Sequence, residues 1–351
     1  MSKPTELGQS LIKALKDVSQ NQHELVTSNR VNSSVFKPIE RLDLAFTKGG
    51  LGDSIARLPV VKYILENCSH IKSVRVFVQD YFLGYARHIF GQYTNVEFVG
   101  YSKMLETIET DPSKVGMNTD SVHHTTIRSH LTDHAFHTLL DEQPVDADAY
   151  NYVQMREPVT TGWEHLTNYV VITTGFTAAV REWPAKEINK VVHWLVEQNI
   201  TPVFLGKTES VFWGSAKTEG FFRPNIQFEL GINLIDSTSL LEASQIMSGA
   251  RAVVGLDNGL LHLAAASDPC VPIIAAYTTV RSEHRLPYRC GVKGFNVRVI
   301  EPIDSSCRFC QSEARFVHQH DFRLCYFDDY ECTKHITGEK FINELKYILE
   351  V

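Results

Sequence analysis

The sequence predicts an α/β protein with two Rossmann-like domains that face a central cleft. Short apolar runs rich in β-branched residues alternate with helical segments, which is the pattern of parallel sheet built from βαβ units. This alternation occurs twice, over 41–101 and again over 169–277, with an irregular stretch between the two. The length of 351 residues fits two domains of ~100–200 residues each.

The first alternation follows a polar segment, 1–40, which we expect to form an N-terminal extension. Residues 41–46 (RLDLAF) form an apolar run that predicts a buried strand. The elements expected after it are helix 53–68, strand 73–79, helix 81–90 and strand 95–101. A stretch rich in His, Thr and Asp follows, with a helix near 131–141. The first domain is therefore expected over 41–165.

The second alternation predicts a domain over 166–335. Its expected elements are strand 169–175, helix 185–198, strand 200–206, helix 239–250, strand 251–257, helix 259–267 and strand 270–277. Apolar residues at helical spacing predict a final amphipathic helix over 339–351.

Composition excludes several classes of protein. Hydrophobic residues make up 43% and charged residues 21%, as in ordinary globular chains rather than disordered or collagen-like ones. Lys and Arg number 34 against 41 Asp and Glu, so the net charge of −7 gives no general attraction to nucleic acid or anionic membranes. The chain shows neither a signal-peptide core nor ~20 consecutive apolar residues. With seven cysteines, an odd number, we expect a cytoplasmic protein with reduced thiols.

The turn after the first strand, KGGLGDSIARLP (48–59), is the first candidate site. Glycines at a strand-to-helix turn let a ligand approach the backbone amides. The turn lacks the third glycine of a dinucleotide fingerprint, where Ile55 stands, and the lysine of a P-loop. Asp53 follows the carboxyl end of a parallel strand, where open α/β sheets bind ligands. Its alternative role is a helix cap, worth about 1 kcal/mol.

A second candidate site follows the strand that begins the second domain. The strand ends at Thr173 and Thr174, and Arg181 precedes the helix that starts near Pro184. Hydroxyls and a guanidinium above a strand end suit a diphosphate, because arginine offers paired charged hydrogen bonds to phosphate oxygens. The alternative is a surface arginine beside a buried Trp183.

A third candidate site lies in GLDNGLLHLAAA (255–266). A strand ends at Asp257, and Asn258 and Gly259 open a helix whose N–H groups and dipole favour an anion. His262 lies within reach of the same place. The alternative is a capping aspartate and a packed core histidine.

The order of the three segments is more specific than any one of them. GDSIARLP, TTG with REWP, and GLDNGLLHLAAA resemble the lipopolysaccharide heptosyltransferase family, glycosyltransferase family 9, whose motifs are GD-x₅-P, (K/R)-x-WP and D-(S/T)-G-x-x-H-x-x-A-A. The resemblance spans roughly 41–350. It implies a GT-B fold in which the C-terminal helix, 336–351, crosses back onto the first domain.

The resemblance also implies an activity and the residues that carry it. Such enzymes move a sugar from a nucleotide diphosphate, ADP-heptose by family default, to a saccharide hydroxyl, with inversion and without a metal for the diphosphate. Asp53 would be the general base, and Arg181 would neutralise the leaving diphosphate. The implied donor-binding residues are Gly52, Thr173, Thr174, Arg181, Asp257, Asn258, Gly259, Leu260 and His262.

The sequence departs from the family pattern in two places. Asn258 replaces the usual serine or threonine, so a hydroxyl to the phosphate is lost while backbone donors remain. The His-rich stretch 123–137 has no counterpart in the family motifs. The candidates for acceptor binding are Lys48, Arg128, His130 and His134, with a solvated helix face as the alternative. A non-saccharide acceptor, such as a modified DNA base or a protein, and an inactive nucleotide-sugar-binding protein are the alternative functions.

Four cysteines cluster near the C-terminus, at Cys307, Cys310, Cys325 and Cys332. One C-x₂-C pair plus two later thiols suits tetrahedral Zn²⁺ in a structural site, although the x₆ spacing of the second pair weakens the match. Alternative ligands are His318, His320 and His335. Free or oxidisable thiols are the other interpretation, and we expect no cofactor for catalysis.

Overall fold

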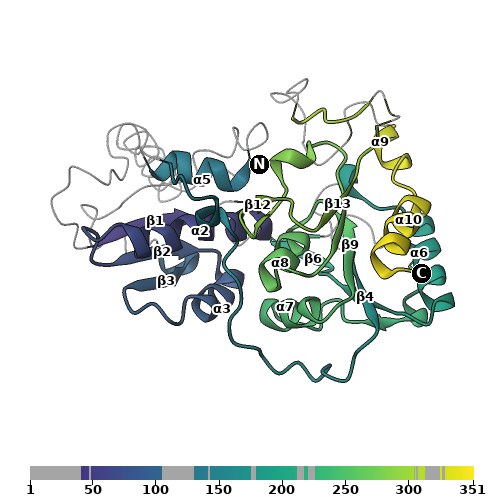
Figure 1. Cartoon of the computed structure of the whole chain (residues 1–351), viewed down its shortest axis with the longest axis horizontal. Helices are drawn as coiled ribbons and strands as arrows, with labels where there is room; N and C mark the ends of the chain where they lie inside the picture. The colour runs from purple at the N-terminus through teal and green to yellow at the C-terminus, as the bar shows by residue number, and fades with distance from the viewer. Residues whose placement is uncertain are drawn as a thin grey trace, which may run out of the picture.

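The structure is a computed structural model. It describes residues 41–46, 49–104, 130–140, 143–174, 179–211, 217–219, 226–303, 305, 307–312, 325 and 329–351. Two parallel sheets with their helices lie side by side (Figure 1). The expected N-terminal extension, 1–40, lies outside the described residues.

The first sheet has the strand order β1-β2-β3, with all pairs parallel. Its strands are β1 (Leu42–Phe46), β2 (Val74–Val78) and β3 (Val96–Gly100). The helices of this part are α2 (Leu51–Asn67), α3 (Asp80–Ile89) and α5 (Leu131–Leu139). Every residue of β1 is buried, including Asp43, whose carboxylate pairs with Arg75 of β2, so the strand is covered on both faces. The predicted elements of this half are confirmed.

The second sheet has six strands in the order β13-β10-β9-β4-β5-β8. They are β4 (Tyr169–Thr173), β5 (Thr201–Leu205), β8 (Ile232–Asn233), β9 (Ala252–Leu256), β10 (Ile273–Ala276) and β13 (Val297–Ile300). From β4 the chain adds β5 and β8 on one side, then returns to add β9, β10 and β13 on the other. The order therefore reverses between β4 and β9, and open α/β sheets bind ligands at such a switch point.

The helices of the second half are α6 (Ala185–Glu197), α7 (Leu240–Ser248) and α8 (Gly259–Ser267), as predicted, with α10 (Gly338–Leu349) at the C-terminus. Shorter elements were not predicted, because two to four residues carry no readable periodicity. They are the strands β8 and β13, the hairpins β6 (Glu209–Val211) with β7 (Lys217–Glu219) and β11 (Tyr288–Arg289) with β12 (Val292–Lys293), the helix α9 (Glu331–Lys334), and the 3₁₀ helices η3 (Ala147–Tyr150), η4 (Ala179–Arg181), η5 (Phe228–Leu230) and η6 (Ser282–His284).

One cluster of buried apolar residues runs through both halves. It contains Leu44 and Val76 of the first sheet together with Val171 and Leu263 of the second half. Helix α2 packs against both α5 and α8, so it joins the two sheets. Because the core is continuous, the domain boundary at residue 165 stays a prediction.

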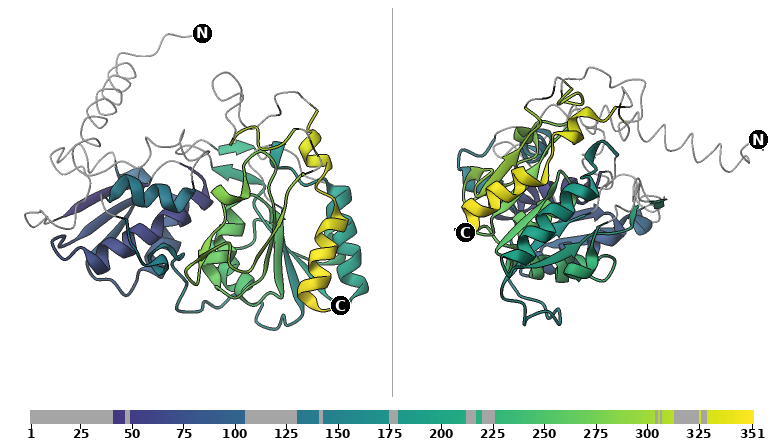
Figure 2. Two further views of the ribbon diagram at one scale, coloured as in Figure 1. Left: turned by 45° about the horizontal axis from the view of Figure 1, so that its top comes forward. Right: turned by 90° about the vertical axis from the view of Figure 1, so that its right-hand side faces the viewer.

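The C-terminal helix does not cross back onto the first sheet, which corrects one expectation. Helix α10 packs chiefly on α6, with further contacts to β9, β10 and β13. Its buried residues Phe341 and Leu345 belong to the core of the second sheet, and Phe341 stacks on Trp183 at 4.0 Å between ring centroids. Figure 2 shows α10 on the side of the second sheet that faces away from the first (yellow). The apolar face of α10 is thus buried against the second half of the molecule.

No helix within the described ranges combines the length and the apolarity that crossing a membrane requires.

Candidate active site

The carboxyl ends of β4 and β9 meet at the switch point of the second sheet. Thr173, the last residue of β4, is buried, and its Oγ1 accepts a hydrogen bond of 3.2 Å from Nδ2 of Asn258. Gly255 provides the space for this hydroxyl, because a Cβ at that position would lie 1.9 Å from Oγ1. Gly255, which precedes Asp257 and Asn258, therefore allows the polar ends of β4 and β9 to lie in contact.

Asn258 caps α8 as well as bridging to β4. Its Oδ1 accepts from the backbone N–H of Leu260 at 2.9 Å and of Leu261 at 3.3 Å. Asparagine is among the best helix caps, which explains how it replaces serine or threonine here. The amide of Leu260, expected to hold a phosphate, is bonded to this side chain. An anion at the helix start would therefore meet the amides of Asn258 and Gly259 first.

Arg181 and Asp257 form an ion pair beside this helix start. Nη1 of Arg181, from η4, lies 3.5 Å from Oδ2 of Asp257, whose side chain is only 8% exposed. Nε of Arg181 and Nε1 of Trp183 are buried without a hydrogen-bond partner among the described residues. Both side chains line a pocket, together with Thr173, Thr174, Ile188, Leu256 and Asn258. The pocket therefore offers two N–H donors and two hydroxyl groups at the carboxyl end of β4.

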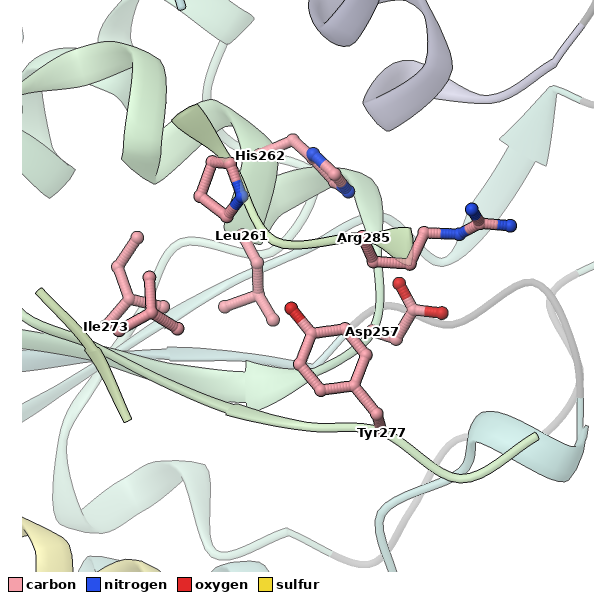
Figure 3. A pocket seen from close by; sticks show the side chains of 8 residues that line it. Asp257, Leu261, His262, Ile273, Tyr277 and Arg285 are labelled. Atoms are coloured by element: carbon pink, nitrogen blue, oxygen red, sulfur yellow. The ribbon is translucent and has the colours of Figure 1, made fainter. Parts of the chain in front are cut away.

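A second pocket lies beside Asp257 (Figure 3). Its lining comprises Asp257, Leu261, His262, Ile273, Tyr277, Arg285, Pro287 and Val297. Arg285 is 8% exposed. Burial lowers the pKa of Arg285, and the charges of Asp257 and Asp53 oppose that effect. The sequence analysis missed Arg285 and Tyr277, because neither belongs to a recognisable motif.

His262 points to the interior and is fixed by a tyrosine. Its Nδ1 lies 2.7 Å from the hydroxyl oxygen of Tyr152, in the segment between η3 and β4, and both residues are buried. Burial lowers the pKa of His262 to about 4, so the imidazole is neutral at neutral pH. Burial also raises the pKa of Tyr152, so the tyrosine keeps its proton. His262 is thus the packed histidine given as the alternative and also lines this pocket, and its role in donor binding stays a prediction.

The starts of α2 and α8 lie in direct contact, and glycines permit it. A Cβ at Gly52 would lie 2.6 Å from Cδ2 of His262. A Cβ at Gly259 would lie 2.6 Å from Cβ of Leu51. The glycine-rich turn after β1 thus brings α2 against the switch point of the second sheet.

Asp53 lies at this junction, half-buried in the first turn of α2. Its Oδ2 accepts a hydrogen bond of 2.8 Å from the N–H of Gly50, so it does support the helix start. Its negative charge also raises the pKa of Tyr81 and of Tyr152, after the larger effect of burial on each. The carboxylate of Asp53 is therefore within electrostatic reach of groups from both halves.

The residues predicted to bind the acceptor have different outcomes in the structure. Lys48 and Arg128 lie outside the described residues. His130 is buried: its Nδ1 accepts from the N–H of Thr132 at 3.2 Å, and its Nε2 lies 2.6 Å from the carbonyl of Leu286. Both ring nitrogens are thus used within the protein, which corrects the expectation that His130 binds an acceptor.

His134 is half-buried on α5, with Nε2 3.1 Å from the hydroxyl of Thr138. Burial, and after it the charge of Arg57, lower the pKa of His134 to about 4. Arg57, on α2, also lies near Tyr81, which is within electrostatic reach of Asp53. Arg57 therefore lies near both Tyr81 and His134, and of these three residues only His134 was predicted.

The four clustered cysteines are all free thiols. Burial, with smaller contributions from Cys307, Cys310 and Cys325, raises the pKa of Cys332 to about 12, so the four thiols are within electrostatic reach of one another. Even so, in the part of the chain that is described, no three His, Cys, Asp or Glu side chains are grouped so as to hold a metal ion.

Comparison with protein families matches residues 129–303, about half of the chain, to glycosyltransferase family 9 (heptosyltransferase). No curated protein sequence matches the chain. The matched range includes the segments around Thr173, Arg181 and Asp257, and it ends just after β13 of the second sheet.

Several solved structures have a similar fold. The iron-containing dodecameric glycosyltransferase TibC of enterotoxigenic E. coli H10407 is 17% identical, covers 90% of this chain and 78% of its own, and gives a TM-score of 0.64. TibC in complex with ADP-D-β-D-heptose gives 0.63 at 16% identity, with 90% and 77% covered. The ADP-heptose lps heptosyltransferase II of E. coli gives 0.57 at 13% identity, with 89% and 98% covered. These neighbours confirm the predicted GT-B fold.

Proposed function

Because the chain belongs to glycosyltransferase family 9 and is a nucleotide-sugar glycosyltransferase, we propose that it transfers a sugar from ADP-heptose or a similar donor to a saccharide hydroxyl. The proposed reaction inverts the anomeric carbon and uses no metal at the diphosphate. The observation that carries the proposal is the contact of the α2 start with the α8 start, because it places Asp53 beside the switch point.

The donor side of the proposal rests on the pocket beside Arg181. Thr173 and Thr174 supply hydroxyls, and Arg181 and Trp183 supply buried donors without partners among the described residues. The adjacent start of α8 favours an anion through its N–H groups and dipole. These groups suit a diphosphate, whose oxygens accept hydrogen bonds and carry negative charge.

In the proposed step, the acceptor hydroxyl oxygen attacks the anomeric carbon of the donor sugar while its proton passes to the carboxylate of Asp53. The bond between that carbon and the diphosphate oxygen breaks, and its electron pair leaves with the nucleoside diphosphate. One displacement from the face opposite the leaving group inverts the anomeric carbon. Arg181 and the α8 amides stabilise the charge that develops on the leaving group.

The variant Asp53→Asn tests the proposal. We expect turnover, measured as ADP released from ADP-heptose with added saccharides, to fall by about 10²–10⁴-fold, the usual contribution of a positioned general base. Nucleotide binding should stay near the wild-type value. Asp80→Asn, at the exposed start of α3, is the matched control and should keep full turnover. Wild-type turnover in Asp53→Asn would show that Asp53 is not the base.

We also propose that Cys307, Cys310, Cys325 and Cys332 hold a structural metal ion. The charges of Cys307, Cys310 and Cys325 each act on the pKa of Cys332, so the four thiols are within electrostatic reach of one another, and four thiolates suit zinc or iron. The similar protein TibC is described as iron-containing. A bound metal would keep these thiols deprotonated and hold down a segment with little core of its own.

The cysteine segment also contacts the donor side. Cys325 packs with Val180 of η4 and with Tyr330, and α9 contacts η4. Since η4 carries Arg181, the segment supports the backbone that positions this arginine.

Metal analysis of the purified chain tests this second proposal. We expect about one zinc or iron per chain, lost in Cys332→Ser and kept in Cys68→Ser, whose thiol is buried elsewhere. Wild-type protein without stoichiometric metal after purification in metal-supplemented medium would contradict it.

A further inference from the structure

We infer that Arg285 is a second cation for the donor diphosphate, beside Asp257 and in addition to Arg181. This inference rests on the proposed function and assigns a role to a residue outside the three motifs. Arg181 pairs with Asp257 and lines the pocket that contains Thr173 and Thr174, whereas Arg285 lines a second pocket together with Asp257 itself.

The placement of Arg285 is visible in Figure 3. Its side chain extends from the loop after η6, and its guanidinium and the carboxylate of Asp257 point to the same side of the pocket. His262 and Tyr277 line the same pocket. Nη1 of Arg285 donates to the carbonyl of His284 at 3.0 Å, which orients the guanidinium from its own backbone.

The loop that carries Arg285 is held from both halves of the molecule. The carbonyl of Ser282 accepts from the N–H of Arg285 at 2.7 Å and of Leu286 at 2.9 Å. From the first half, Nε2 of His130 lies 2.6 Å from the carbonyl of Leu286. Because a ligand-binding group needs a fixed backbone, this double anchoring suits a residue whose guanidinium must keep its position.

The charges near Asp257 favour a further cation for a diphosphate. Asp53 and Asp257 are acidic, Arg181 is paired with Asp257 at 3.5 Å, and Arg57 lies one turn after Asp53 on α2, so these four groups sum to zero. A diphosphate that leaves during the reaction gains a further negative charge. Arg285 brings the sum to one positive charge, which attracts that diphosphate, and interactions between partly buried charges are stronger than in water.

A neighbouring arginine shows the contrasting structural role. Arg289 is fully buried and donates to the backbone carbonyls of Val271 and Asn296, at 2.8 and 2.9 Å, and to that of Phe295. It ties loops together and lines neither of the two pockets. Arg285 instead lines a pocket together with an acidic side chain of the switch point.

Calorimetric binding of ADP and AMP to the full chain tests the inference. In Arg285→Gln we expect the dissociation constant for ADP to rise about ten- to hundredfold, the range for a hydrogen bond to a charged group. The constant for AMP should change by less than about threefold, because the β-phosphate is the proposed contact. Arg285→Lys should recover part of the loss, since lysine keeps the charge but not the paired geometry.

The control is Arg298→Gln, an exposed arginine that stacks on Tyr347 and should leave both constants unchanged. Equal weakening of ADP and AMP in Arg285→Gln and no recovery in Arg285→Lys would indicate a structural role and overturn the inference. Unchanged ADP binding in Arg285→Gln would overturn it as well, while leaving the proposed function intact. Wild-type protein that binds none of ADP, GDP and UDP would overturn both.

Discussion

The hydroxyl of Tyr152 lies 2.7 Å from Nδ1 of His262, and both side chains are buried between the two sheets. Tyr152 belongs to the segment that connects the halves, whereas His262 lies on α8 in the motif that opens at Asp257. A protonated Tyr152 that donates to Nδ1 leaves the imidazole proton on Nε2. The ring edge with Nε2 faces Gly52 at the start of α2. The connecting segment therefore sets the orientation of a histidine at the junction.

Tyr152→Phe should destabilise the protein and weaken catalysis. The change leaves Nδ1 of His262 buried without a partner, which costs about 1–3 kcal/mol of the free energy of unfolding. Freed from this bond, the imidazole can exchange its proton between the two nitrogens, so kcat should fall together with stability. Denaturant unfolding and steady-state kinetics measure both effects. Tyr347→Phe, on the exposed side of α10, should change neither.

Gly255→Ala should disrupt the switch point. The new Cβ would lie 1.9 Å from Oγ1 and 3.2 Å from the carbonyl oxygen of Thr173, so β4 and β9 have to separate. We expect a loss of at least about 2 kcal/mol, as for overpacked cores, and weaker nucleotide binding. Adding Thr173→Ala should recover part of the stability by removing the hydroxyl.

Gly84→Ala is the matched control for this steric argument. Nothing lies within 4 Å of a Cβ at Gly84, in the middle of α3. There the alanine should raise stability by about 0.5–1 kcal/mol through helix propensity. Equal losses in Gly255→Ala and Gly84→Ala would contradict the close contact of β4 with β9.

The free energy of unfolding should fall as the pH drops from about 7 to about 5. A histidine in the unfolded chain binds a proton near pH 6.5. Burial lowers the pKa of both His130 and His262 to about 4. Between these values the unfolded chain holds more protons, so each histidine reduces stability by up to about 1.4 kcal/mol per pH unit.

His130→Asn separates this effect from other titrations, because asparagine still caps α5 but does not titrate. The dependence of stability on pH should become shallower in this variant. His137→Asn, an exposed position on the same helix, should keep the wild-type slope. A wild-type slope in His130→Asn would show that His130 does not contribute to the pH dependence.

Local patterns predicted most of the fold. Periodicity located the long helices and strands, because burial follows the period of each element, and β1 and α8 agree with prediction to within a residue or two. The order of strands β4 and β9 and the packing of α10 depend on long-range contacts that no local pattern encodes. The hairpin at Tyr288 is local, but its strands are too short to show a periodicity.

The site was predictable where its residues lie in motifs at strand ends. Thr173, Arg181, Asp257 and Asn258 come together because parallel strands of one sheet end at the same edge. Arg285 was not predictable, because the sequence alone indicates a surface charge for an arginine in a loop. Only the fold shows that this arginine is buried. His130 was misassigned because a polar residue in a polar stretch gives no sign that both its nitrogens are used internally.

The central claim is that the switch point between β4 and β9 binds the diphosphate of a nucleotide-sugar donor. Thermal unfolding of the wild-type chain with ADP, GDP, UDP and CMP tests it most directly. Binding stabilises the folded state by about 2.7 kcal/mol at a hundredfold excess over the dissociation constant. We predict a clear rise in Tm with one nucleoside diphosphate, ADP in the first place, and a smaller rise with its monophosphate. No rise with any of these nucleotides would contradict the account.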